Sequence, residues 1–246
     1  SALFSVAVRW TSRLIGIAST LVLARLLAPD DFGVTAIAAI VLGLASVLLD
    51  IGVNVALIRN ANATSEHYNS AWTLRMAQAV AITLILLLVA PFAGAYFHDP
   101  RVVPVIMILA LNVSIGSLEN IGIVTFQKEM KFGLEFRYLL TNRLFGFLCT
   151  VGVALILRNY WALVVAGTAT QIFAVFNSYL SHPMRPRWST KKIREILSVS
   201  QWIFFQNIGG YLDNTLHRLL VGRRDSTAMM GAYTLADGVA SMPSSE

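Results

Sequence analysis

Residues 72–95 read WTLRMAQAVAITLILLLVAPFAGA, and this stretch decides the fold class. Arg75 is its only charged side chain. An α-helix rises about 1.5 Å per residue, so roughly 20 apolar residues cross the hydrocarbon core of a bilayer, which is about 30 Å thick. The stretch therefore predicts a transmembrane helix.

Apolar runs of similar length recur along the whole chain. We expect spans at about 5–27, 34–58, 72–95, 102–126, 134–157, 161–180 and 197–221, with an eighth starting near residue 230. Short connectors with turn-forming residues, such as His98-Asp99-Pro100, separate them. The predicted fold class is all-α: a polytopic transmembrane helix bundle of about seven to eight spans.

The composition agrees with this prediction. The 246 residues are 56% hydrophobic and 13% charged, with a mean hydropathy of +0.66, whereas about 25% of the residues in a soluble domain are charged. The formal net charge of +6 raises the question of a nucleic-acid partner. A cytoplasmic N-terminus, however, places thirteen basic residues on the cytoplasmic side and six on the other. Membrane topology thus explains the charge, and no nucleic acid is expected.

The two ends of the sequence suggest a fragment. The first residue is Ser1 rather than Met, and the chain stops at Glu246 while another apolar segment is running. We therefore expect the chain to be part of a longer protein. The basic connector from Arg185 to Arg194 divides six spans from those that follow, and we expect it to form an interfacial helix on anionic headgroups.

Polar side chains recur at one depth inside the predicted spans. Ionisable residues are costly in hydrocarbon and are functional candidates by default. Five side chains fall about 12–15 Å from the cytoplasmic end of their helices, namely Arg13, Asp50, Glu119, Arg143 and Gln171. Arg75 is shallower and could snorkel to the interface. The interpretation that we favour is a hydrated cavity. The alternative is a set of ion pairs between neighbouring helices, Arg13–Asp50 and Glu119–Arg143.

The seventh predicted span carries a second polar face. Gln206, Gly210, Asp213 and His217 follow the spacing of one helix face. A carboxylate one turn from an imidazole could carry a proton near neutral pH, so Asp213 and His217 are candidates for ion coupling. The alternative is a pair that only neutralises both groups.

Other kinds of chemistry lack the residues they need. Cys149 is the only cysteine, and the four histidines show no metal-ligand spacing. No glycine-rich phosphate loop is present. We expect no disulfide, metal site, cofactor or ATP hydrolysis.

Three stretches resemble a known family. They are LARLLAPDDFG at 23–33, LDIGVNVALIR at 49–59, and YLDNTL at 211–216 followed by GAYTLA at 231–236. The sequence is similar here to Wzx-type polysaccharide flippases of the multidrug/oligosaccharidyl-lipid/polysaccharide exporter superfamily. The first stretch is mainly architectural. We expect Pro29 to end the first helix, Asp30 or Asp31 to cap the second, and Gly33, after Phe32, to relieve the turn. We also expect Arg25 to pair with these carboxylates.

The resemblance implies a two-lobe exporter in the bacterial inner membrane. Residues 1–184 would form the N-terminal lobe, 185–196 the connector, and 197–246 the start of the second lobe. The implied activity moves an undecaprenyl-pyrophosphate-linked oligosaccharide across the membrane by alternating access, among membrane lipids and other polysaccharide-assembly proteins. Candidate pyrophosphate residues are Arg13, Arg75 and Arg143. Candidate polar or ion-coupling residues are Asp50, Glu119, Gln171, Asp213 and His217.

Rival functions make different demands on the sequence. A drug or ion antiporter of the same superfamily would want an acidic cavity, whereas these spans hold slightly more arginines than carboxylates. A membrane-embedded polysaccharide polymerase or ligase would need a large external loop, and every external connector is short. A scaffold protein without transport activity predicts that substitutions of the polar side chains at this depth, here called the polar belt, are harmless.

Overall fold

The computed structural model describes residues 15–16, 18–49, 52–60, 62–197 and 236, and this part of the chain is helical with no strand. The labelled elements are α2 (Pro29–Leu49), α3 (Val53–Arg59), α4 (Ser65–Tyr96), α5 (Val102–Ser117), the 3-10 helix η1 (Ile121–Ile123), α6 (Val124–Lys128), α7 (Phe132–Leu157) and α8 (Trp161–Ser181). Residues 18–26 form a further helical stretch, here called the first helix. The all-α prediction is confirmed.

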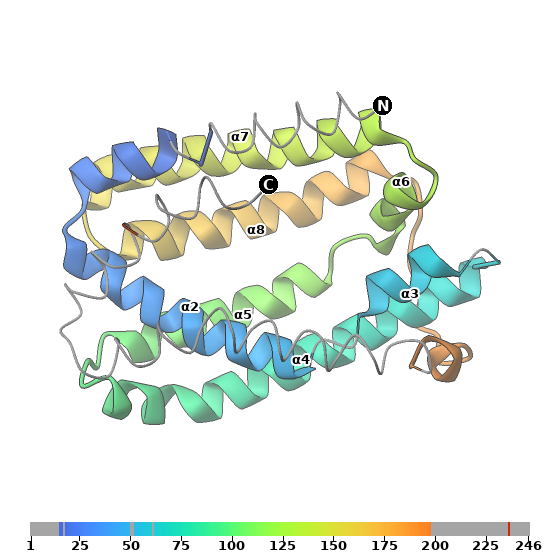
Figure 1. Ribbon diagram of the computed structural model, residues 1–246, viewed down its shortest axis with the longest axis horizontal. Helices are drawn as coiled ribbons and strands as arrows, with labels where there is room; N and C mark the ends of the chain where they lie inside the picture. The colour runs from blue at the N-terminus through green and yellow to red at the C-terminus, as the bar shows by residue number, and fades with distance from the viewer. Residues whose placement is uncertain (1–14, 17, 50–51, 61, 198–235, 237–246) are drawn as a thin grey trace.

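The long helices form two layers (Figure 1). Helices α7 and α8 lie side by side in one layer, and α2, α4 and α5 lie in the other. Helix α5 is central because it packs against α2, α4 and α8. The first helix packs against the C-terminal end of α7 and the N-terminal end of α8. The contact is formed by Leu23, Leu27, Ala154 and Ala162.

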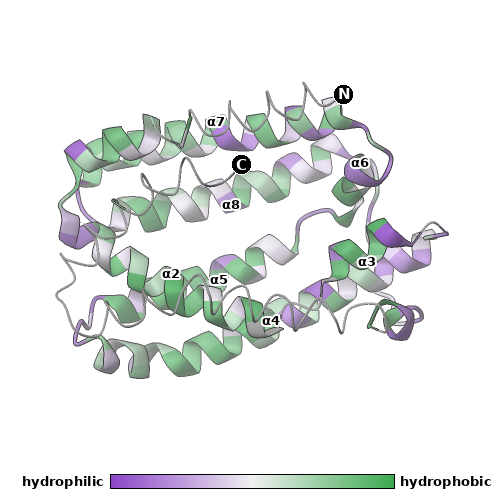
Figure 2. Ribbon diagram, viewed as in Figure 1, coloured by the Kyte–Doolittle hydropathy of each residue, from purple (hydrophilic) through white to green (hydrophobic). Residues whose placement is uncertain are grey.

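The helices carry the expected membrane character. Four of the described helices are long and apolar enough to cross a membrane, and five if the bent pair from Val102 to Lys128 counts as one span. Figure 2 shows hydrophilic residues gathered at the two ends of the bundle, with a further hydrophilic patch partway along α7. The spans expected at 197–221 and near 230 lie almost wholly outside the described residues.

Two predicted spans are not single helices. The span expected at 34–58 divides into α2 and α3, and Gly52 precedes α3 in a left-handed conformation with φ 63°. The span expected at 102–126 bends by 67° between α5 and the η1–α6 pair. Both runs are long and mostly apolar, so hydropathy predicted one continuous helix for each.

The loop after the first helix differs in detail from its prediction. Pro29 is the first residue of α2 rather than the end of the first helix, and the Asp31 carboxylate accepts from the amides of Ala28 (3.1 Å) and Tyr160 (2.9 Å). Gly33 is buried inside α2 and makes no turn. Capping by Asp31 is confirmed, and it also holds the start of α8.

Arg101, not Arg25, neutralises this end of the bundle. Its guanidinium contacts Asp99 at 2.7 Å and Asp30 at 2.6 Å, and these hydrogen bonds raise the pKa of Arg101. Arg25 is exposed and forms no ion pair within the described ranges, so the expected pairing of Arg25 is wrong.

The basic connector is docked to the bundle at the opposite end. Residues 182–190 have no regular secondary structure and helix is present only over 193–197, so the interfacial helix expected from Arg185 to Arg194 is wrong for most of its length. The first turns of α4 hold the connector backbone: Asn69 accepts from the Arg187 amide (3.0 Å) and Thr73 from the Ser189 amide (3.0 Å). Lys191 forms an ion pair with Glu66 at 2.8 Å, which raises the pKa of Lys191.

Candidate functional site

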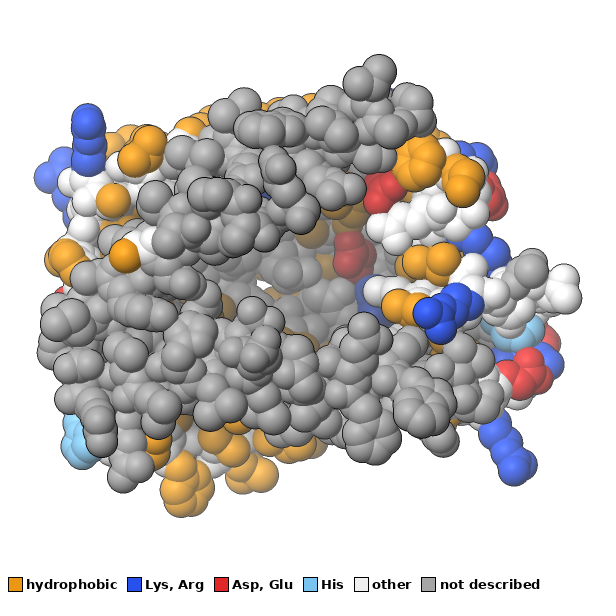
Figure 3. Space-filling model, viewed as in Figure 1, with side chains coloured by type: hydrophobic (Ala, Val, Ile, Leu, Met, Phe, Trp, Pro, Cys, Tyr) orange, Lys and Arg blue, Asp and Glu red, His pale blue; other side chains and the backbone are white. Residues whose placement is uncertain are grey.

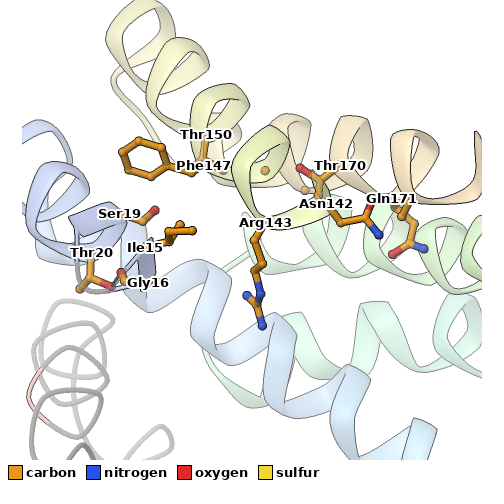
Figure 4. A pocket seen from close by; sticks show the side chains of 13 residues that line it. Ile15, Gly16, Ser19, Thr20, Asn142, Arg143, Phe147, Thr150, Thr170 and Gln171 are labelled. Carbon is orange, nitrogen blue, oxygen red and sulfur yellow. Dashed lines mark hydrogen bonds between the residues drawn. The ribbon is translucent and has the colours of Figure 1, made fainter. Parts of the chain in front are cut away.

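A pocket of about 460 Å³ lies between the first helix, α7 and α8. Its lining is rich in small and polar residues: Ile15, Gly16, Ser19, Thr20, Asn142, Arg143, Gly146, Phe147, Thr150, Gly167, Thr170, Gln171 and Ala174. Figure 4 shows Arg143 extending from α7 away from Asn142 and Gln171. The sequence predicted two of these residues, Arg143 and Gln171, to lie at mid-depth, and the fold brings them into one pocket.

Arg143 is the charged residue of this pocket. It lies roughly 17 Å along α7 from the start of that helix, close to its middle. Its side chain is exposed, and among the described residues it has no carboxylate or hydrogen-bond partner. The alternative of a Glu119–Arg143 ion pair is therefore wrong. An unpaired guanidinium at this depth needs water or an anionic ligand around it, because hydrocarbon cannot solvate the charge.

Amides and hydroxyls connect the pocket to the helix contacts around it. Asn177 donates to Asn142 across α7 and α8 at 2.9 Å, and Asn112 donates to Thr168 across α5 and α8 at 3.0 Å. The Asn112 carbonyl oxygen is buried with no hydrogen-bond partner in the described part of the chain. Gln171 has its carboxamide close to Gly116, where an added Cβ would come within 2.8 Å. Some polar side chains of this region therefore form hydrogen bonds between helices, whereas others line the pocket.

Arg75 serves a different purpose, at the break after α5. It is partly buried, and its guanidinium donates to the carbonyl oxygens of Gly116 (3.2 Å), Ser117 (3.1 Å) and Glu119 (2.6 Å). The Gly116 carbonyl also accepts from the Glu119 amide at 3.1 Å, whereas Arg75 is the donor to Ser117 and Glu119 at the end of a helix inside a membrane, where each unsatisfied group is expensive. A cation also stabilises the negative end of the α5 dipole. Arg75 does not line the pocket.

Other side chains complete the break. Tyr179 donates to the Leu118 carbonyl at 3.0 Å, and Tyr138 donates to the Glu119 carboxylate. Asn120 is only 1% exposed; its amide side chain donates to the His182 and Met184 carbonyls and accepts from the Gly122 amide. Every backbone carbonyl from Gly116 to Glu119 therefore has a side-chain donor.

His182 closes this region from the connector side. Its Nδ1 accepts from the Met184 amide at 3.2 Å, so its proton lies on Nε2, which is 3.1 Å from Thr125 Oγ1. Burial lowers the pKa of His182, so the neutral ring is the stable form at neutral pH. Sequence reasoning placed Asn120 on a polar helix face beside Glu119 but missed Tyr138, Tyr179 and His182. The one available signal was the polar pair Glu119-Asn120 followed by Gly122 inside an apolar run.

The space between the layers is visible from outside. Figure 3 shows one face of the molecule hollowed near its centre, with an acidic and a basic side chain in view on one wall of the hollow. No group of three or more histidine, cysteine or acidic residues suited to a metal lies within the described ranges. Four predicted site residues, Arg13, Asp50, Asp213 and His217, lie outside the described residues.

These features define a multi-pass α-helical membrane protein with a polar pocket between its helices. Residues 22–246 match the sequence profile of a family described as polysaccharide biosynthesis protein. The chain therefore belongs to this family. No solved structure matches the chain significantly.

Three curated relatives match nearly all of the chain. The lipopolysaccharide biosynthesis protein WzxC of Escherichia coli (strain K12) is 23% identical over 238 residues, covering 93% of this chain and 47% of the relative. An uncharacterized membrane protein in the cps region of Klebsiella pneumoniae is also 23% identical, covering 94% and 49%. The succinoglycan biosynthesis transport protein ExoT of Rhizobium meliloti (strain 1021) is 20% identical, covering 90% and 45%. The chain spans about half the length of these relatives.

Proposed function

We propose that the protein is a flippase that moves an undecaprenyl-pyrophosphate-linked oligosaccharide across the bacterial inner membrane. The observation that carries the proposal is Arg143, whose guanidinium has no partner among the described residues and is open to a polar pocket near the middle of a membrane-crossing helix. The family and the printed names of two relatives, one for lipopolysaccharide biosynthesis and one for succinoglycan transport, support a polysaccharide substrate.

The chemistry of the pocket suits such a substrate. A planar guanidinium remains charged in a membrane and can bind two phosphate oxygens together. The carboxamides of Asn142 and Gln171 offer donors and acceptors for sugar hydroxyls. We assign the pyrophosphate to Arg143 and, from the sequence, to Arg13. Arg75, with its donors engaged by carbonyls, is assigned to holding the broken span.

Alternating access would need a wall of the cavity that can move. The breaks between α2 and α3 and between α5 and η1 divide two spans into shorter rigid pieces. We propose that these pieces shift relative to α7 and α8 as the cavity changes the side to which it opens. Asp50, Asp213 and His217 remain the proposed ion-coupling residues, with Glu119 as a further candidate.

The rival antiporter function is less well supported. An antiporter for cationic drugs or ions would place a carboxylate in the cavity, whereas the described lining of this pocket holds Arg143 and no acidic residue. Glu119 is directed to Tyr138 instead. A polymerase or ligase would need a catalytic external loop, and the loops between α4 and α5 and between α7 and α8 are short.

Export in a complemented deletion strain tests the proposal. Arg143→Ala should reduce surface polysaccharide at least about tenfold, because one charge-assisted contact to phosphate is lost, and lipid-linked oligosaccharide should accumulate. Arg143→Lys should restore part of the export. Arg158→Ala removes a charge from the end of the same helix and should export normally. Normal export in Arg143→Ala at equal protein levels would contradict the assignment of the pyrophosphate to Arg143.

The orientation is a second part of the proposal. We place the N-terminus and the connector in the cytoplasm because of the distribution of arginine and lysine. In a Cys149→Ala background, Thr190→Cys should be labelled only from the cytoplasm and His98→Cys only from the periplasm; both positions are exposed. Reversed labelling would overturn the orientation.

A further inference from the structure

A second pocket, of about 270 Å³, lies between α7 and α8 near the end of the bundle where the connector is docked. Its polar lining includes Arg137, Thr141, Asn177 and Ser181, and its apolar lining includes Leu134 and Leu180. Arg137 is the sixth residue of α7, within about 8 Å of the start of the helix. The pocket therefore lies at the level where a bilayer changes from hydrocarbon to headgroups.

This second pocket faces away from the first. Arg137 and Arg143 are six residues apart on α7, and at 100° per residue their side chains point about 120° apart. The α7–α8 contact separates the two, through the Asn142–Asn177 hydrogen bond and the stacked rings of Phe145 and Phe173 (3.9 Å between centroids). The pockets share no lining residue. A ligand of the second pocket would therefore not occupy the proposed substrate site.

The charge of the second pocket is uncompensated. Arg137 is exposed, and its guanidinium has no carboxylate or hydrogen-bond partner in the part of the chain that the structure describes. The nearest acidic residue along α7, Glu135, accepts a hydrogen bond from Gln127 at 2.7 Å instead. The lining itself holds no carboxylate. This composition favours an anionic ligand.

The apolar side of the pocket continues into a stripe of exposed residues. On α8, Leu180 is 71% exposed, and Phe176 (62%) and Ile172 (54%) follow it at four-residue intervals on the same face. On α7, Leu148 is 66% exposed on the side of Arg137 and Thr141. A ligand with a charged head at Arg137 could thus lay a hydrocarbon chain along this stripe.

The hydroxyl groups of Thr141 and Ser181 indicate which kind of anionic headgroup the second pocket would bind. Thr141 already donates its proton to the Arg137 carbonyl at 2.7 Å, and Ser181 donates to Asn177 at 3.4 Å. Both oxygens are left as acceptors, so they suit a headgroup that brings hydroxyl donors of its own.

We propose that this pocket binds the headgroup of an anionic glycerophospholipid of the phosphatidylglycerol type. Its phosphate contacts Arg137, its glycerol hydroxyls donate to Thr141 and Ser181, and an acyl chain follows the Leu180–Ile172 stripe. The site does not depend on the proposed transport function.

Lipid retention by the complete protein tests the site. The protein is purified in detergent and titrated with phosphatidylglycerol, and native mass spectrometry counts the bound lipid. Arg137→Gln should weaken retention of one lipid about tenfold, the loss expected for one charge-assisted hydrogen bond. Thr141→Leu keeps the charge but fills the pocket, and it should also reduce retention. Phosphatidylcholine should bind poorly, and inorganic phosphate at the same concentration should not displace the lipid.

Matched controls decide between a site and a general attraction of charge. Arg158→Gln removes one charge from the other end of α7 and should retain lipid like the parent protein. Equal losses in Arg137→Gln and Arg158→Gln would overturn the site, and so would unchanged retention in Arg137→Gln or Thr141→Leu. Displacement by inorganic phosphate would show an anion site rather than a lipid site and would overturn the lipid assignment.

Discussion

Two arginines inside the membrane-crossing helices have opposite surroundings. Arg75 has its guanidinium engaged by the carbonyls of Gly116, Ser117 and Glu119 at the end of α5. Arg143 is exposed to a pocket and has no partner among the described residues. Both stand in predicted spans and both were candidate pyrophosphate residues, so the sequence separated them only by depth. The break around Arg75 is a closed, fully bonded region, whereas the pocket around Arg143 is an open one.

The different surroundings of Arg75 and Arg143 predict that the first contributes to stability and the second to ligand binding. A charge whose donors are all used holds structure, and its removal leaves buried acceptors without partners. A charge without partners adds little to folding and is retained at some desolvation cost, which is expected of a ligand site. The two regions should therefore respond differently to the same substitution.

The largest expected effect is on the closed region. Arg75→Ala should lower the stability of the purified protein by about 3 kcal/mol, since several carbonyls lose their donor together. Arg143→Ala should change it by less than about 0.5 kcal/mol. Thermal unfolding in detergent measures both. Equal stability of the two variants would contradict the assignment of a structural role to Arg75 and not to Arg143.

A pair of glycines extends the comparison. A Cβ at Gly122 would overlap the His182 ring, which is held by Met184 and Thr125, so Gly122→Ala should cost about 2 kcal/mol. A Cβ at Gly116 meets only the mobile end of Gln171, and Gly116→Ala should cost less than about 1 kcal/mol. The same melting experiment applies. A larger loss in Gly116→Ala than in Gly122→Ala would contradict the assignment of the closed region.

A smaller effect is expected at the other end of the bundle, where one arginine is paired and another is not. Arg101→Gln breaks a partly exposed contact to Asp30 and a contact to the buried Asp99 carboxylate, and it should cost about 1 kcal/mol, less at high salt. Arg25→Gln is the control and should be neutral. A salt-dependent loss in Arg25→Gln instead would show that the pairing of Arg101 is not the relevant one.

The smallest expected effect is a pH dependence of the local stability of the closed region. Because burial holds the pKa of His182 below its usual value of 6.5, the folded state resists protonation. The contribution of neutral His182 is complete above pH 6.5 and is lost as the pH falls through the lowered pKa. Hydrogen exchange at the Gly122 and Met184 amides should accelerate between pH 7.5 and 5.5 after correction for intrinsic rates. His182→Gln should abolish this change, and its persistence would point to another group.

Much of the fold was predictable from the sequence by itself. Runs such as 72–95 are long and apolar enough that only a membrane-crossing helix satisfies both the backbone and the side chains. The capping of α2 was also predictable, because Asp31 accepts from the nearby Ala28 amide through short-range chemistry, although the roles expected for Pro29 and Gly33 were wrong. Position along the chain likewise placed Arg143 and Gln171 at similar depths, and both line the pocket.

Tertiary structure alone decided what each polar residue does. Arg75 meets the end of α5 across 41 to 44 residues of sequence, and Arg101 meets Asp30 across 71. Helix periodicity describes one helix at a time, so it cannot say which polar stripes meet or which remain open. The break after α5 left only a weak signal in the sequence, because the carbonyls of Ser117, Leu118 and Glu119 are satisfied by side chains from α4 and α8. The sequence determined that these helices cross a membrane, and their packing decided which arginine is bonded to backbone carbonyls and which has no partner among the described residues.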